Sequence, residues 1–277
     1  MKLRTLTVAF VASSALALTA CPGDDLTYAE AKDAVVEATL ASDAASLAEG
    51  SVEIATSFTL GGAVEQAASE IRDFITSQMP CAEVTLAGAT LTVEYGKNPG
   101  NCQYRGRTYS GTHTITISRK ESEVVVDHTW LDLSNGRVEV DGSAHVTWDL
   151  EAKSRRVEHE LTWTRLSDGQ SATGSGDRTQ SPLGGSWENG ISVDGSRSWE
   201  GPRGTWDLDI DTVEWRWIDP IPQSGTYTLP PPPDKTLSMT FSRVDDDTIE
   251  VFVEGARRDF SFKVTKIGKV TGEDPDA

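Results

Sequence analysis

The fold is decided by the stretch VEVDGSAHVTWDL, residues 138–150. Apolar residues at positions 138, 140, 144, 146, 148 and 150 alternate with polar ones, which predicts a long β-strand with one buried and one wet face. Asn135-Gly136 comes just before it and is typical of a two-residue hairpin turn, which pairs Leu133 with Val138. The stretch therefore predicts antiparallel pairing with the strand that precedes it.

The same period of two continues on both sides of this stretch. It predicts further strands near residues 91–95, 109–119, 123–133, 157–166, 191–199, 205–210, 212–217, 236–243, 248–253 and 259–264. The connections are short, so neighbouring strands should pair as an antiparallel meander. Val124, Val126 and Trp130 share one parity, whereas Leu131 and Leu133 share the other, and we expect a β-bulge near Trp130.

Two helices are predicted in residues 27–79. Thr27 and Glu30 have the spacing of a capping box, so the first helix starts there, and Gly50 is expected to interrupt or end it. The second helix carries an apolar stripe at Val64, Ala67, Ala68, Ile71, Phe74 and Ile75, and Pro80 stops it. We expect this stripe to pack on the sheet.

The predicted fold class is therefore α+β and mainly β. An N-terminal helical segment (27–79) leads into an antiparallel β domain (80–265), which curls into an open sheet or partial barrel, and a loose polar tail follows (266–277). Residues 135–163 and 189–217 share Asn-Gly, Val-Asp-Gly-Ser and Trp-Asp-Leu in the same order. This echo predicts a duplicated hairpin unit, with chance convergence of turn chemistry as the alternative.

The first 21 residues carry the clearest sorting signal. Lys2 and Arg4 precede an apolar stretch, residues 6–18, that is short for a membrane span, and Leu18-Thr19-Ala20-Cys21 closes it. This arrangement resembles the lipobox signal peptide of bacterial lipoproteins. The resemblance implies cleavage after residue 20, lipidation of Cys21 with palmitate or similar chains, and a polar linker over residues 21–26. An ordinary secretory signal and an uncleaved anchor helix are the alternatives.

The resemblance also bears on location. In enteric bacteria an Asp directly after the lipidated cysteine favours the inner membrane, but this chain has Pro22 there. The resemblance therefore implies the outer membrane of the cell envelope. With Cys21 assigned to lipid, Cys81 and Cys102 remain, and two cysteines in an exported chain predict a disulfide bond. A metal site is the alternative, but no CxxC pair or Cys/His cluster lies near either cysteine.

Charge excludes one class of partner. The 277-residue chain has 25 Lys+Arg against 43 Asp+Glu, a net charge of −18, and loss of Lys2 and Arg4 with the leader leaves −20. Such a field repels nucleic acid, so we expect no nucleic-acid partner, and we expect membrane contact through the N-terminal lipid. Solubility and self-repulsion account for the acidity without a specific cation.

The four histidines do not converge in the predicted registers. A turn at Lys120-Glu121 places His113 opposite His128, a turn at Lys153-Ser154 pairs His159 with Trp148, and His145 falls on the other face. Asp207, Asp209 and Asp211 should line an exposed face, and residues 245–247 should cap a hairpin. Either acidic set could attract calcium, but neither has the spacing of a calcium loop. We therefore predict no metal, cofactor or catalytic residues.

These patterns favour a non-catalytic role. We expect an exported, lipid-anchored envelope lipoprotein with a structural or binding function and no enzymatic activity. A lipid or lipoprotein carrier with an apolar concave sheet is the first alternative, and a glycan-binding module or a hydrolase is the second. A glycan module should expose a row of the tryptophans at 148, 163, 206, 215 and 217, which otherwise belong to the core.

Overall fold

The computed structural model describes residues 25–56, 63–120, 123–149, 151–202, 204–229, 235–255 and 257–275. The leader, Cys21 and most of the linker lie outside the described residues. Two helices come first, α1 (Tyr28–Ile54) and α2 (Val64–Gln78). The strands are β1 (Glu83–Ala87), β2 (Thr90–Tyr95), β3 (Gln103–Tyr104), β4 (Arg107–Thr108), β5 (Ser110–Lys120), β6 (Glu123–Ser134), β7 (Val138–Asp149), β8 (Ser154–Arg165), β9 (Ser171–Pro182), β10 (Ile191–Gly201), β11 (Gly204–Trp215), β12 (Ser224–Leu229), β13 (Leu237–Arg243), β14 (Thr248–Glu254), β15 (Asp259–Thr265) and β16 (Val270–Gly272).

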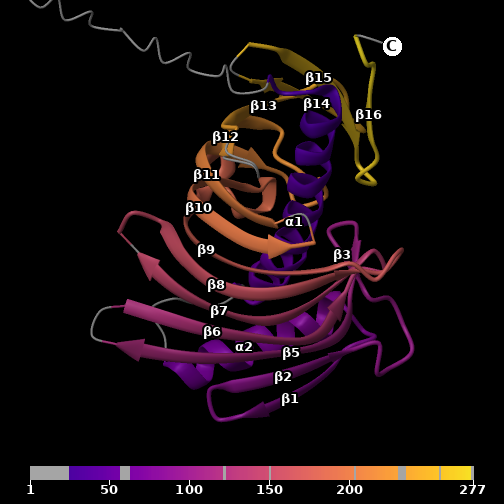
Figure 1. Ribbon diagram of the computed structural model, residues 1–277. Helices are drawn as coiled ribbons and strands as arrows, with labels where there is room; N and C mark the ends of the chain where they lie inside the picture. The colour runs from indigo at the N-terminus through magenta and orange to yellow at the C-terminus, as the bar shows by residue number, and fades with distance from the viewer. Residues whose placement is uncertain are drawn as a thin grey trace, which may run out of the picture.

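The strands form one long meander. Fourteen of them pair in sequence order as a single antiparallel sheet that does not close, while β3 and β4 form a small separate hairpin. The sheet curls around α1, and α2 covers the same face near β2 and β5 (Figure 1). We call the face toward the helices the inner face and the other the outer face. This confirms the predicted fold class.

Helix α1 is enclosed by the sheet for half of its length. Its start is the predicted capping box, because the Glu30 amide donates to Thr27 Oγ1 and the Glu30 carboxylate accepts from the Thr27 amide. Every residue from Ala41 to Ile54 is buried, so no side of this part faces water. Apolar and polar residues are accordingly spread around the helix instead of forming a stripe.

Gly50 does not end α1, contrary to the expectation. A side chain at this position would overlap the Tyr109 hydroxyl, so glycine permits a close approach between the helix and the start of β5. In α2, by contrast, the predicted stripe is confirmed, since Ala67, Ala68 and Ile71 are buried.

Several predicted strand registers are wrong by two or four residues. The β5–β6 hairpin places Lys120 opposite Glu123, so His113 lies opposite Trp130 and not His128. In the next two hairpins Leu133 pairs with Val140, a shift of two, and His159 pairs with Ala144 instead of Trp148, a shift of four. Even shifts keep each side chain on its predicted face, because the side-chain period of a strand is two.

The predicted β-bulge is confirmed, since the register of β6 against β7 shifts between Trp130 and Leu133. Asp132 lies in the bulge with φ 52°, and its amide donates to Asp141 Oδ1 at 2.9 Å. A second bulge has the same contact, because the amide of Thr212 (φ 46°) donates to Asp194 Oδ1 at 2.8 Å. An Asp-Gly pair thus fixes each bulge.

Each copy of the sequence echo covers one antiparallel hairpin, β7–β8 or β10–β11, and supplies the Asp-Gly pair of one bulge contact, but the echoed residues do not occupy equivalent places. The first copy keeps Val140 and Trp148 on one strand, β7, whereas the second places Val193 on β10 and Trp206 on β11. The first bulge precedes its Asp-Gly strand, and the second follows it.

Some segments differ from the predicted boundaries. Strand β9 occupies a Gly- and Ser-rich segment that was not predicted as a strand, and the two strands expected over 205–217 are one strand, β11. The tail expected to be loose contains β16, which pairs with β15. The disulfide Cys81–Cys102 is present as predicted, with 5.3 Å between the Cα atoms. It tethers the β3–β4 hairpin beside β1.

Candidate functional site: a polar groove on the outer face

The inner face is occupied by a buried charge network between α1 and the sheet. Arg178 contacts Glu49 at 2.5 Å, and Arg155 lies 3.7 Å from Glu49 and 4.0 Å from Glu53. Burial lowers the pKa of Arg155 and raises the pKa of Glu53, while the neighbouring opposite charges act against both shifts. Breaking such a pair leaves an uncompensated buried charge, so the network fixes the position of α1.

Two more arginines hold the same helix. Arg197 donates to the Ala41 carbonyl and to Ser42 Oγ, and Arg107 donates to Ser46 Oγ at 2.5 Å. Several buried donors in this network have no partner within the described part of the chain, among them Arg178 Nε and Arg197 Nε. The inner face is therefore filled by a helix that polar contacts hold in place.

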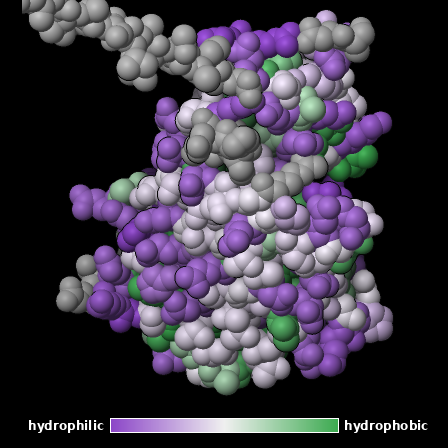
Figure 2. Space-filling view, in the orientation of Figure 1, coloured by the Kyte–Doolittle hydropathy of each residue, from purple (hydrophilic) through white to green (hydrophobic). Residues whose placement is uncertain are grey.

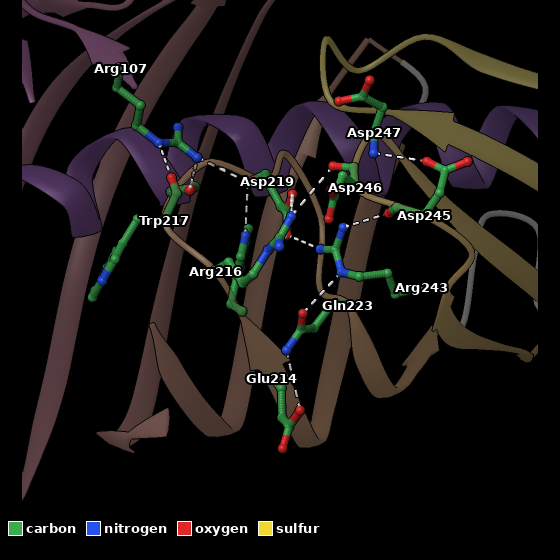
Figure 3. A network of polar contacts seen from close by, with 12 residues as sticks. Arg107, Glu214, Arg216, Trp217, Asp219, Gln223, Arg243, Asp245, Asp246 and Asp247 are labelled. Atoms are coloured by element: carbon green, nitrogen blue, oxygen red, sulfur yellow. Dashed lines mark hydrogen bonds and ion pairs between the residues drawn. The ribbon is translucent and has the colours of Figure 1, made fainter. Parts of the chain in front are cut away.

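A second polar network secures the loop between β11 and β12 (Figure 3). The buried Asp219 carboxylate pairs with Arg216 and Arg243, and its backbone carbonyl accepts from Arg107. Arg107 also donates to the Trp217 carbonyl. Because the Asp219 carboxylate is paired with two arginines and Asp219 is 1% exposed, the network is an anchor for the loop, not an accessible site.

Three of the four histidines are buried on the inner face. His113 Nε2 lies 2.9 Å from His128 Nδ1, so they are diagonal neighbours joined by a hydrogen bond. Burial lowers the pKa of His113 to about 3 and the pKa of His128 well below its ordinary value. Burial, with Arg178 and Arg197 nearby, does the same to the pKa of His159. These rings are neutral packing groups at pH 7.

The outer face carries a groove of about 840 Å³ across strands β6 to β11. Two rows of outward side chains flank it, each row running from strand to strand in register. The first row is Asp127, His145, Glu158, Asp177, Ser196 and Asp209, and the second is Thr129, Ser143, Glu160, Ser175, Ser198 and Asp207. Between the rows lies a floor formed at residues 128, 144, 159, 176, 197 and 208.

Six carboxylates line the groove, from β6, β8, β9 and β11. Where β9 and β10 line it, Asp177 is accompanied by small residues, Ser175, Ser196, Ser198 and Gly176. Its one lining arginine, Arg197, is 5% exposed and extends to α1 on the inner face. At one end His145 Nδ1 lies 2.7 Å from Asp127 Oδ1. Hydrophilic residues cover much of the molecular surface around the strands (Figure 2).

Arg156, at the edge of the outer groove, forms ion pairs with two of the lining carboxylates. Its guanidinium binds both carboxylate oxygens of Asp177, at 2.8 and 2.6 Å, and lies 3.0 Å from Glu158. The hydrogen bond to Arg156 lowers the pKa of Asp177, and the same contact raises the pKa of Arg156. Two-pronged contacts of this kind are specific for the planar guanidinium group.

One acidic group lies outside the groove. The ligand atoms of Asp132, Glu139 and Asp141 all lie within 4.8 Å of one another, beside the β6 bulge. Sequence analysis predicted the bulge but not this convergence, because Asp132 reaches the other two only through its positive φ. The aspartates at 207, 209 and 211 are exposed, as predicted.

The tryptophans do not form a sugar-binding row. Seven of the eight rings are buried, and Trp187 is partly buried. Trp199 and Trp206 stack at 5.9 Å, and Trp148 and Trp187 meet edge to face. The rings therefore belong to the core, not to an exposed platform.

Comparison of the chain with protein-family models, characterised proteins and solved structures gave no match. Within the described ranges, neither helix has the length and apolar character needed to cross a bilayer. The functional argument therefore rests on the residues of this chain.

Proposed function

We propose that this protein is an exported envelope lipoprotein, anchored by lipid on Cys21, which binds a partner in the outer groove and catalyses no reaction. The Leu18-Thr19-Ala20-Cys21 run supports the anchor. One acyl chain gives only marginal membrane binding, whereas the two or three chains on a lipoprotein cysteine give durable attachment. Pro22 in place of Asp favours the outer membrane.

The observation that carries the binding role is the filling of the inner face. A lipid carrier needs an apolar space inside the curved sheet, but α1 occupies that space, and buried ion pairs such as Arg178–Glu49 hold it there. Access for a partner is therefore from the outer face. The outer groove offers ordered polar side chains on rigid strands, which suits recognition.

The start of α1 gives the anchored protein an orientation. Lys235 donates to the Asp25 carbonyl at 3.1 Å, and Arg257 lies 3.6 Å from its carboxylate. The segment from Cys21 to Asp25 spans at most about 14 Å. The end of the molecule at β13–β15 thus faces the membrane, and α1 extends about 40 Å away from it (Figure 1). This arrangement leaves the groove on the side of the molecule.

Expression in a bacterial host with radiolabelled palmitate, followed by intact-mass spectrometry, tests the anchor. We expect label in the wild-type protein, a mass consistent with loss of residues 1–20 and addition of acyl chains, and recovery in the outer-membrane fraction. Cys21→Ser should abolish the label and leave the disulfide intact. A wild-type product that retains Met1, or that lacks an acyl group, would overturn the proposal.

A further inference from the structure

The outer groove has the charge of a receptor for a basic ligand. Six carboxylates line it, and Arg156, at its edge, pairs with two of them, Glu158 and Asp177. The one arginine among the lining residues, Arg197, extends to the inner face. Electrostatic complementarity favours a cationic partner and increases its association rate. Because acidic residues are common on this chain, charge alone does not select a ligand, and three further features narrow the choice.

The first feature is the contact that Arg156 already makes. Its guanidinium occupies Asp177 and Glu158 at the edge of the groove, through a two-pronged contact. The outward carboxylates therefore lie at a spacing that accepts an arginine side chain. Glu160 and Asp207, in the other row, have the same outward exposure.

The second feature is the small size of most side chains where β9 and β10 line the groove. Ser175 lies opposite Ser198, Ser196 lies opposite Asp177, and Gly176 is in the floor. Short side chains let a peptide backbone approach the sheet, and serine hydroxyls both donate and accept hydrogen bonds. This region suits main-chain amides better than a bulky apolar group.

The third feature is the distance between two acidic positions in the groove, one on β8 and one on β11. Glu158 and Glu160 lie on β8, and Asp207 and Asp209 lie on β11, which is three strands away. With strands about 4.8 Å apart, the two positions are separated by about 14 Å. An extended peptide covers that distance in about four residues, and side chains four residues apart point to the same side.

From these features we infer that the outer groove binds an extended basic segment of a partner protein, with two Lys or Arg residues four positions apart. One cationic side chain contacts Glu160, beside the Arg156–Glu158 pair, the segment's backbone crosses the serines, and the second contacts Asp207 and Asp209. The inference rests on the proposed function, because it names the partner chemistry of the same groove.

Two peptides of identical composition test the spacing. The first is Gly-Arg-Gly-Ser-Gly-Arg-Gly, and the second, Gly-Gly-Ser-Arg-Arg-Gly-Gly, has adjacent arginines. Titration into the full mature chain is followed by NMR, at low salt, through the backbone amides of Ser175, Ser196 and Ser198. We expect the spaced peptide to shift these amides and to bind at least about fivefold more tightly than its isomer, the effect of one additional ion pair.

Matched variants separate the groove from the general acidity of the chain. Glu160→Gln/Asp207→Asn should weaken the spaced peptide about tenfold, whereas Glu83→Gln/Glu254→Gln, which removes the same charge elsewhere, should have little effect. Equal weakening by both variants, equal affinity for both peptides, or absence of binding would overturn the inference. Acylation of Cys21 is measured independently, so those outcomes leave the anchor proposal standing.

Discussion

Acidification should destabilise this protein more steeply than its surface charges alone predict, because three histidines are held neutral in the core. His113, His128 and His159 are 0%, 2% and 8% exposed. His113 and His128 contact each other and Trp130, and Tyr95 contacts His113. Arg178 and Arg197 lie near His159. Burial is the main cause that disfavours the imidazolium form of each ring.

The sign follows from proton linkage. All three folded-state pKa values lie below the ordinary value of 6.5, so the unfolded chain takes up protons that the native protein excludes. The three neutral histidines therefore make their full contribution to the free energy of unfolding above about pH 6.5, and this contribution is lost as the pH falls below 6.5. Each histidine removes about 1.25 kcal/mol between pH 7 and pH 5.5, and the three together remove about 4 kcal/mol. Glu53, whose pKa is raised, acts in the opposite direction nearer pH 5.

Urea unfolding, monitored by tryptophan fluorescence at a series of pH values, measures this loss. His113→Phe/His128→Phe keeps ring packing on Trp130 but removes two titrating groups. We expect it to lower stability at pH 7 and to reduce the loss between pH 7 and pH 5.5 to about 1.3 kcal/mol. His145→Gln, on the exposed face, should leave the loss near 4 kcal/mol. If the double variant keeps the full pH dependence, the buried histidines are not its source.

Three other substitutions probe the framework by chemical denaturation. Arg178→Ala removes the closest partner of the buried Glu49 carboxylate, which keeps only Arg155 at 3.7 Å, and should cost about 3 kcal/mol, whereas adding Glu49→Gln should recover part of this loss; full stability of the single variant would contradict a structural role for the pair. Cys81→Ser/Cys102→Ser removes a disulfide between residues 21 positions apart and should lower the free energy of unfolding by about 3 kcal/mol. As a control, a reducing agent should destabilise the wild type more than it destabilises this variant. Gly111→Ala, at φ 92°, would overlap the backbone of the β6 bulge and should cost more than about 1 kcal/mol, while the open turn position Gly136→Ala isolates the cost of positive φ alone; equal losses would exclude the overlap.

Local patterns in the sequence predicted most of the elements. The capping box at Thr27, the apolar stripe of α2 and the alternation in 138–150 each depend on neighbours within a few residues. The same holds for the bulge near Trp130, where two parities conflict within one strand. Strand β9 was missed because its glycines and serines carry no apolar alternation, and it is ordered by β8 and β10 on either side.

Pairwise contacts between distant residues were not predictable. The interior arginines were not identified, because nothing near Arg155 or Arg178 in the sequence indicates a buried charge. Their partners lie on α1, more than a hundred residues earlier. The outer groove was also missed, since Glu158, Asp177 and Asp207 belong to different strands. Only the strand registers place these residues in adjoining rows.

The sequence by itself determined the class of fold, the disulfide and the faces of the strands, because periodicity and capping are short-range properties of the chain. The tertiary structure decided which charges are buried, where α1 lies and which outward residues form the groove. The physical reason is that burial and charge pairing depend on distances across the sheet. Those distances are set by how fourteen strands curl around one helix.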